Sequence, residues 1–297
     1  MNPPTSRSQH PAHRGSIACE QARVLEQQAH PGEQYILRVE APDCARRAQP
    51  GQFAHLGCDP LLPLRRPLSI LRARPKQGQV EFLYKAVGQG TRLLAQRRAG
   101  DVIRLLGPIG RPFSPAPTHP RALLLGGGVG MPPMVFLAEH LKARPGFEPL
   151  VLLASEVPFP FRVAPSKILL PDMPEGVIGA MPLLDDWGIP SRLASLQGFA
   201  GCHQGYITDL ARHWLDRLDA RTRGEVALYA CGPHPMLAAV AALAREYGLP
   251  CQVSLEEYMA CAVGGCAGCV VEVHSEEGTA MKRVCVDGPV FDAAQVF

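Results

Sequence analysis

The sequence predicts a multi-domain protein: an antiparallel β-barrel, then a doubly wound α/β parallel sheet, then a small C-terminal cysteine domain. Three observations carry this prediction. The chain has 297 residues, more than one hydrophobic core usually organises. Its apolar residues change from short, broken runs to continuous runs that alternate with helical patterns. Four of its ten cysteines gather near the C-terminus.

The composition is that of a globular protein, with 46% hydrophobic and 19% charged residues. A net charge of +3 gives no electrostatic argument for binding nucleic acid or a membrane surface. No apolar run reaches the length of a membrane span. Residues 1–18 are polar and rich in proline, without an apolar signal core, and we expect a disordered tail. A long chain with clustered thiols favours a cytoplasmic metal protein over a secreted disulfide scaffold.

The first domain is predicted over residues 19–117. Runs such as "YILRVEAP", "GQFAHLGC", "QVEFLYKAV" and "DVIRLLGP" are separated by glycine and proline. Alternation with regular turn signals is typical of a small β-barrel. The stretch "GQGTRLLAQR" interrupts this pattern and predicts a short helix capped near Thr91.

The second domain is predicted over residues 118–250. "RALLLGGGVGMPPMVFLAEHLKAR" indicates a strand, a glycine loop and a helix, and "EVALYACGPHPMLAAVAALAREYG" repeats that order. Continuous apolar strands alternating with helices predict a parallel sheet covered on both faces. Residues 155–205 give no resolved pattern, and their length suits a long active-site loop.

The third domain is predicted over residues 251–297. After the cysteines, "VVEVHSEEGTAMKRVCVDGPVF" predicts two strands joined by a polar turn.

The glycine loop suggests a dinucleotide site. Gly127, Gly128 and Gly130, with Gly126 before them, lie between a buried strand and a helix. Glycines there let the backbone approach a ligand, and the helix start attracts phosphate. A tight turn without a ligand is the alternative. Glu156 follows the next strand, where an acid can hold a ribose hydroxyl and favour NAD over NADP, or can be an ordinary exposed side chain.

A second loop follows a later strand of the same sheet. Cys231 is the last residue of "YAC", and Gly232 and Pro233 are the first two residues of the "GPHPM" that follows it. Because ligands bind beyond the carboxyl ends of parallel strands, this loop shares an edge with the glycine loop. Cys231 can equally be a buried structural thiol, and we assign His234 no role.

The barrel carries two phosphate-type features. Arg66 and Ser69 flank Pro67 in "RRPLSI", and an arginine fork suits phosphate oxygens. Gly90 and Thr91 open the short helix. Each alone can be a surface arginine or a simple cap; together they suggest a bound pyrophosphate cofactor.

The clustered cysteines predict an iron–sulfur site. Cys261, Cys266 and Cys269 are spaced C-x4-C-x2-C, and Cys285 follows after fifteen residues. This is the plant-type [2Fe-2S] spacing. Small intervening residues leave room for a cluster and expose N–H groups to its sulfurs. Structural zinc more often takes two separated C-x2-C pairs. A zinc site remains the alternative to an iron–sulfur cluster here. Cys251 is a possible substitute ligand whose spacing fits less well.

Taken together, these motifs resemble the ferredoxin-reductase superfamily. "RRPLS", "FLYKAVGQGT", "LLGPIG", "LLLGGGVGMPPM" and "YACGPHPML" occur in the order which that superfamily uses. With "VSLEEYMACAVGGCAGCVVEV" and "VCVDGPVF", the chain is similar from about residue 19 to 297 to the electron-transfer subunits of dihydroorotate dehydrogenase type B. The resemblance implies an FAD domain, an NAD domain and a [2Fe-2S] domain. It places flavin on Arg66, Pro67, Leu68, Ser69, Leu83, Tyr84 and Lys85, with its pyrophosphate at Gly90 and Thr91, and the cluster on the four cysteines.

The implied activity is electron transfer between NAD(H), FAD and the cluster, and then a flavin in a separate catalytic subunit of pyrimidine biosynthesis, so that a hetero-oligomer is expected. Nicotinamide exchanges two electrons as hydride, the cluster carries one, and a flavin can do both. Cys231 and its loop would then flank the nicotinamide. The rival hypotheses are a related NAD(P)H-dependent subunit serving another oxidoreductase or oxygenase, and a non-enzymatic zinc module. Tyr258 and Ala262 stand where family members often carry Arg and Gly, and residues 155–199 do not match the usual connection.

Overall fold

The computed structural model describes residues 15, 17–276 and 278–297. Most of the tail predicted at residues 1–18 therefore lies outside the described residues. Ala18, the last residue of that predicted tail, is the first residue of strand β1 (Ala18–His30). No helix in the described part of the chain is long and apolar enough to cross a membrane.

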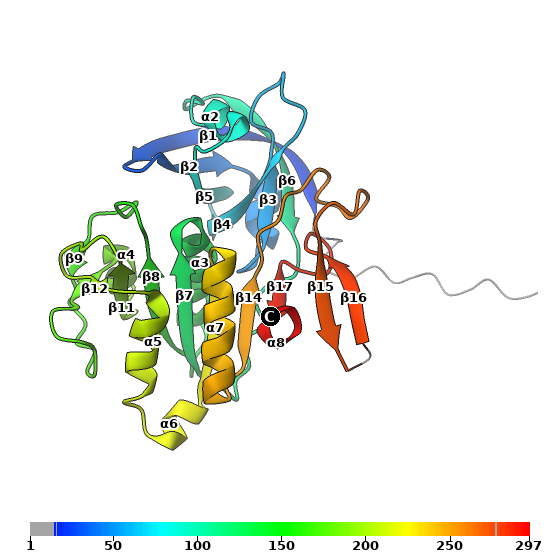
Figure 1. The fold of residues 1–297 in the computed structure, drawn as a ribbon. Coiled ribbons are helices and arrows are strands. Elements are labelled where there is room, and N and C mark those ends of the chain that lie inside the picture. Colours follow the sequence, from blue (N-terminus) through cyan, green and yellow to red (C-terminus); the bar gives the residue numbers. More distant parts are fainter. Residues whose placement is uncertain (1–14, 16, 277) are drawn as a thin grey trace, which may run out of the picture.

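The N-terminal domain is a closed antiparallel barrel (Figure 1). Its strands follow the order β1-β2-β5-β4-β3-β6. After β1 come β2 (Gln34–Glu40), β3 (Phe53–Leu56), β4 (Arg66–Arg74), β5 (Gln79–Lys85) and β6 (Val102–Ile109). Alternate side chains such as Leu37, Leu56, Ile70 and Phe82 fill the interior and are fully buried. The broken apolar runs of the sequence are the strands of this barrel.

Two short helices accompany the barrel, α1 (Pro42–Arg47) and α2 (Gln89–Leu94). The predicted helix at "GQGTRLL" is present, but its cap is Gly88 and not Thr91. Thr91 lies three residues into the helix, and its Oγ1 accepts a hydrogen bond from the Gly88 N–H at 3.1 Å. The threonine side chain therefore reaches back to the cap residue, as in a capping box.

The central domain is a seven-stranded sheet in the order β12-β11-β8-β7-β13-β14-β17. Its parallel strands are β7 (Arg121–Gly127), β8 (Glu148–Ala154), β11 (Ser191–Ser195), β12 (His203–Gln204), β13 (Val226–Cys231) and β14 (Cys251–Ser254), and β17 (Val290–Asp292) is antiparallel. Helix α3 (Met131–Lys142) covers one face. Helices α5 (Ile207–Leu215) and α7 (His234–Tyr247) cover the other (Figure 1). The predicted doubly wound parallel sheet is confirmed.

Residues 155–205 contain short elements and two strands of the main sheet, β11 and β12. A small hairpin pairs β9 (Ala164–Pro165) with β10 (Gly179–Ala180), and α4 (Pro182–Asp186) follows it. A further short helix, α6 (Ala220–Gly224), precedes β13. The segment therefore extends the sheet rather than forming one long loop.

The C-terminal region forms the predicted hairpin, β15 (Val270–Ser275) with β16 (Gly278–Arg283), and ends in α8 (Ala293–Val296). However, β14 and β17 both belong to the central sheet. The boundary predicted between residues 250 and 251 therefore falls before a strand that the sheet includes. The cysteine region is an excursion between two neighbouring strands of that sheet, and its hairpin lies beside it (Figure 1).

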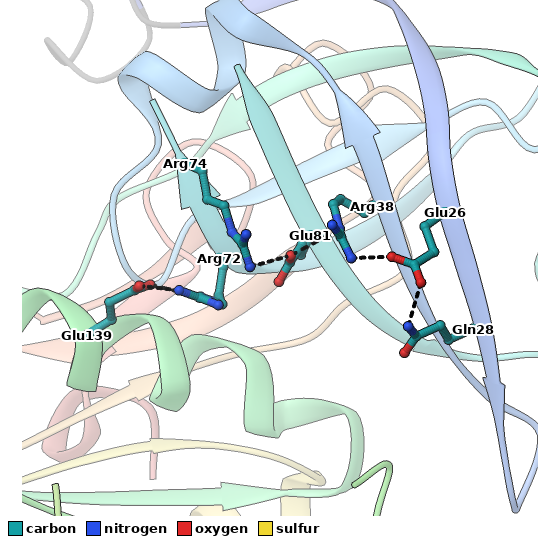
Figure 2. A network of polar contacts seen from close by, with 7 residues as sticks. All are labelled: Glu26, Gln28, Arg38, Arg72, Arg74, Glu81 and Glu139. Atoms are coloured by element: carbon teal, nitrogen blue, oxygen red, sulfur yellow. Dashed lines mark hydrogen bonds and ion pairs between the residues drawn. The ribbon is translucent and has the colours of Figure 1, made fainter. Parts of the chain in front are cut away.

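A polar network lines the barrel where it meets the sheet domain (Figure 2). The Arg72 guanidinium on β4 donates to both carboxylate oxygens of Glu139 on α3, at 2.6 and 3.2 Å. It also lies 4.8 Å from the ring centroid of Trp187. Within the barrel, Glu81 pairs with Arg38 and Arg74, at 3.3 and 3.0 Å. The bidentate bond ties β4 to the glycine-loop helix, and the stacking ties it to Trp187 at the end of α4.

Candidate functional site

The carboxyl edge of the sheet faces the barrel. The turn Gly128–Gly130 at the end of β7 contacts β5, and α3 packs along β4. Leu71 and Leu83 of the barrel share a buried apolar cluster with Met131, Met134 and Cys231. The sequence predicted that the two sheet loops share an edge, and the structure brings that edge against the strands that carry the predicted flavin residues.

Arg66 and Gly90, predicted as two parts of one phosphate site, lie together. A side chain at Gly90 would place its Cβ 2.7 Å from the Arg66 Nε. Gly90 is buried, while Arg66 and Thr91 are partly accessible. Arg66 donates through Nη1 to the carbonyls of Leu64 and Arg65, and this orients the guanidinium. The glycine leaves the space that the Arg66 guanidinium occupies.

Barrel alternation separates the other predicted flavin residues into two groups. Leu68 and Tyr84 point into the barrel core. Tyr84 stacks on Tyr35 and donates a hydrogen bond to Gln27 at 2.9 Å. Pro67, Ser69, Leu83 and Lys85 lie at the alternate positions, which face outward. Pro67, Ser69 and Lys85 can therefore present side chains to a flavin. Leu83 is packed in the apolar cluster between barrel and sheet, and Leu68 and Tyr84 can contribute only backbone.

The two sheet loops pack against each other through their glycines. A Cβ at Gly130 would lie 2.3 Å from the Cys231 carbonyl oxygen, and one at Gly127 would lie 2.4 Å from the Met236 sulfur. A Cβ at Gly232 would likewise lie 3.3 Å from the Gly127 Cα. Gly128, in contrast, has a φ of +55° and open space around its Cβ position. Gly127 and Gly130 thus permit loop packing, and Gly128 leaves backbone open to a ligand.

Cys231 is a neutral thiol at this edge. It is fully buried at the end of β13. Burial raises the pKa of the Cys231 thiol well above its usual value, and the Glu256 carboxylate adds to the rise. The Ser254 hydroxyl and the Gly232 amide act in the opposite direction without cancelling it. A protonated thiol is a poor nucleophile, so Cys231 can shape a binding surface but does not attack a substrate.

Glu256 is a site residue that the sequence pattern did not reveal. Its side chain is exposed at the surface, and the protein packed near its carboxyl raises the pKa of that group. It follows β14, the strand next to β13, and Cys231 feels its charge. The only signal in the sequence was an acid just after a short apolar strand. That strand itself was not predicted.

Glu156 makes contacts within the protein. It lies after β8 and accepts hydrogen bonds from the Leu196 N–H at 3.4 Å and the Gln197 side chain at 3.1 Å. The carboxylate thus ties the end of β8 to the loop after β11.

The loop after β13 leads directly into α7. Pro233 caps this helix, and His234, to which the sequence analysis gives no role, packs on Phe297 with ring centroids 4.9 Å apart.

Three of the predicted ligands, Cys261, Cys266 and Cys269, lie in one loop, and Cys285 follows the hairpin and adjoins Cys269. The N–H groups of Val263 and Cys266 donate to the Cys261 sulfur, at 3.5 and 3.4 Å. Burial alone would raise the pKa of Cys261, but these N–H groups outweigh it and lower that pKa to about 7. Burial raises the pKa of Cys285 to about 12, and the adjoining Cys269 thiol adds to the rise.

The structure also ties the fourth cysteine to the loop. The Val284 N–H donates to the Cys269 carbonyl at 2.8 Å, and this places Cys285 beside Cys269. Within the described ranges, no three His, Cys, Asp or Glu side chains are placed to bind a single metal ion. Cys251 lies apart, in β14 opposite Leu228. Four thiols with inward N–H groups form a donor set that fits a [2Fe-2S] cluster.

Comparison with known proteins agrees with this site. Residues 256–297 match the family model of the iron-sulfur cluster binding domain of dihydroorotate dehydrogenase B. The electron transfer subunit of dihydroorotate dehydrogenase B (NAD(+)) from Geobacillus kaustophilus is 38% identical over 286 residues, covering 94% of this chain and 99% of that protein. The corresponding subunit from Desulforamulus reducens is 33% identical over 267 residues, covering 88% and 92%.

Solved structures show the same architecture. A structure of NADH-dependent reduced ferredoxin-NADP oxidoreductase superimposes with a TM-score of 0.73 and 26% identity, covering 94% of this chain and 90% of that one. The ferredoxin reductase of carbazole 1,9a-dioxygenase shares the fold, with a TM-score of 0.61, 20% identity, and 79% and 67% coverage.

The barrel, the sheet and the cysteine loop therefore define an oxidoreductase of the ferredoxin-reductase type. Within that class, the chain belongs to the family of the electron transfer subunits of dihydroorotate dehydrogenase B (NAD(+)). The family and the fold class expected from the sequence are confirmed, and the family model confirms the iron–sulfur domain over zinc.

Proposed function

We propose that this chain carries electrons between NAD(H), FAD and a [2Fe-2S] cluster and exchanges them with a catalytic subunit that oxidises dihydroorotate. The observation that carries the proposal is the course of residues 254–261. Ser254 and Glu256 lie against Cys231, and Cys261 begins the cysteine loop five positions after Glu256. One short segment thus joins the sheet edge suited to nicotinamide to the loop suited to the cluster.

The flavin would be held on the outer face of the barrel. Arg66 and Gly90 supply the arginine fork and the space beside it for a pyrophosphate. Pro67, Ser69, Leu83 and Lys85 face the same side of the barrel wall, and Leu68 and Tyr84 pack on its inner side. Thr91 keeps the Gly88–Gly90 backbone in place through its bond to Gly88. When bound, flavin supplies the exchange between two-electron and one-electron carriers.

The nicotinamide nucleotide would lie across the edge formed by the two sheet loops. Gly128 offers open backbone at the start of α3, where phosphate is favoured. Cys231, Gly232 and Pro233 form the other side of this edge. Because the Cys231 thiol remains protonated, its role is to position the ring without forming a bond to it.

The cluster would be held by Cys261, Cys266, Cys269 and Cys285. The N–H groups that lower the pKa of Cys261 stabilise its thiolate, which is the form that binds iron. Cys266 is exposed and Cys269 is buried, so one side of the loop is accessible to a docking protein.

All ten cysteines are free thiols, which supports a reducing compartment, and we place the protein in the cytoplasm.

The partner is tested by purifying the chain together with the flavin-containing subunit encoded in the same organism. We expect dihydroorotate to reduce the flavin and the cluster of this chain only when that subunit is present. Bleaching of their visible absorption measures this reduction. NADH should reduce the chain with or without it. Reduction by NADH but never by dihydroorotate would instead favour a related subunit that serves another oxidoreductase or oxygenase. A colourless protein that contains one zinc ion would contradict the proposal altogether.

A further inference from the structure

His55 is a buried polar side chain on the outer face of the barrel. Strand β3 has the sequence Phe-Ala-His-Leu, and Ala54 and Leu56 point into the barrel core. Phe53 points the other way, into an apolar cluster that also contains Cys269 and Cys285. Strand alternation places His55 on the same outer face as Phe53. Its side chain is fully buried, with 0% of it exposed.

Two backbone carbonyls from different domains approach the His55 ring. One belongs to Arg65, the residue before the predicted flavin motif, and the other to Met259, two residues before Cys261. Pro67 of the flavin motif lies directly opposite His55 in the strand ladder. Neither ring nitrogen makes a completed hydrogen bond to any residue in the described part of the chain. His55 therefore lies between the flavin motif and the start of the cysteine loop.

The ring is neutral in this place. Burial lowers the pKa of His55 to about 4, and the positive charge of Arg65 adds to the effect, against the pull of the two carbonyls. A neutral imidazole has one N–H to donate. A buried polar group without a partner costs free energy that an apolar residue would avoid, so packing alone does not account for a histidine here. A donor that faces the Met259 carbonyl can fasten the segment before the cluster to the barrel.

We propose that His55 is a positioning residue that holds the segment before the cysteine loop against the flavin-bearing face of the barrel. The Met259 and Arg65 carbonyls both lie near the ring, whose single N–H can donate to only one of them, and we assign that donor to Met259. The contact sets how the cluster loop lies relative to the flavin motif, and so how readily an electron leaves reduced flavin and enters the cluster. This inference rests on the proposed electron-transfer function.

The test compares His55→Phe, which keeps a ring but has no donor, with His55→Gln, which keeps an N–H donor. His140→Gln, at an exposed site on α3, is the control. Anaerobic stopped-flow should show the same NADH reduction of flavin in all the proteins. Transfer from flavin to the cluster should slow about tenfold in His55→Phe and remain closer to wild type in His55→Gln. Hydrogen exchange of the backbone amides at 256–263 should be faster only in His55→Phe.

The proposal is overturned if His55→Phe matches wild type in both hydrogen exchange and cluster reduction. It is overturned equally if the Phe and Gln variants are impaired alike, or if NADH reduction of the flavin slows as much as the later step. Failure of the proposed function is distinguishable, because wild-type protein itself would then show no cluster reduction, while the hydrogen-exchange comparison would still decide whether the contact exists.

Discussion

At the scale of single residues, the pair Cys231 and Glu256 shows how the site controls protonation. The thiol is buried and neutral, and the protein around the Glu256 carboxyl disfavours the charge of that group. Glu256 follows the strand next to that of Cys231, and its charge disfavours ionisation of the thiol. The Cys231 thiol therefore adds no negative charge to the edge of the sheet, which suits a surface that receives a nucleotide.

This arrangement makes stability depend on Glu256 and pH. Its pKa is raised from 4.5 in the folded protein, so the folded state holds the proton more tightly than the unfolded chain. Stability contributed by this group is therefore lost as pH rises above about 4.5. We expect Glu256→Gln to unfold at a higher temperature than wild type at pH 7, with a difference that shrinks toward pH 4. Thermal unfolding across this range, with Glu257→Gln as control, measures it. A constant difference would refute the prediction.

The sequence identified many candidate residues but not the direction in which each one points. It grouped Gly127, Gly128 and Gly130 as one phosphate loop, whereas only Gly128 has open space. It grouped Leu83 with Tyr84, although strand alternation places them on opposite faces of the barrel wall. Glu256 was missed because its importance comes from the packing of β14 beside β13, a contact between distant parts of the chain.

At the scale of elements, the cysteine loop depends on unusual backbone conformations. Gly264, Ala262 and Ala267 have φ angles of +82°, +58° and +52°. This left-handed region is natural for glycine and strained for alanine. Ala262 therefore carries backbone strain that the glycine expected there from the resemblance would avoid. The turns direct N–H groups toward the Cys261 sulfur.

Two opposite substitutions test the strain in this loop. Ala267 is exposed, so Ala267→Gly relieves a positive φ without losing packing and should stabilise the holoprotein by about 1 kcal/mol. Gly264→Ala adds a Cβ 2.5 Å from the Val286 side chain at a φ of +82°, and should destabilise by at least as much. The readout is the urea concentration at which half of the cluster absorbance is lost. Equal midpoints in the two variants would contradict this account.

Most elements were predictable because their residues show the expected periodicity. The barrel strands, the glycine-loop helix and the C-terminal hairpin follow patterns that persist over several residues. Strands β9, β10 and β12 have two residues each, too few to show any pattern. Strand β11 reads Ser-Arg-Leu-Ala-Ser, and its buried serines and arginine conceal a core strand behind a polar composition.

At the scale of the whole molecule, the contacts of Arg72 hold the barrel against the sheet domain. Its side chain is only 15% exposed, and it joins Glu139 by two hydrogen bonds while stacking near Trp187. The pair with Glu139 links β4, which carries the flavin motif, to α3, which follows the glycine loop (Figure 2). The interface therefore sets the distance between the two predicted cofactor surfaces.

A double-mutant cycle measures this connection. Arg72→Gln should cost about 2 kcal/mol because it loses both the carboxylate and the ring, and Glu139→Gln about 1 kcal/mol. The coupling energy between them should be about 1 kcal/mol, since the pair is partly shielded from water. Urea unfolding of the four proteins gives these values. Additive effects would show that the ion pair contributes nothing to the joint.

The order of the domains was predictable, but their boundary was not. Strands β14 and β17 frame the cysteine region within the central sheet, and their pairing brings together residues 252 and 292. A pairing across that separation leaves no local signal. Its consequence is functional, because it anchors both ends of the cysteine region to the sheet that carries the nucleotide edge.

The central claim is that electrons from NADH reach the four-cysteine cluster through flavin. Anaerobic titration with NADH, followed by visible and electron paramagnetic resonance spectra of wild type and Cys269→Ser, tests it most directly. We predict that wild type loses flavin absorption and gains the signal of a reduced [2Fe-2S] cluster, while Cys269→Ser loses only the flavin absorption. A reduced-cluster signal that persists in Cys269→Ser but disappears in Cys251→Ser, or a wild-type cluster that NADH never reduces, would contradict it.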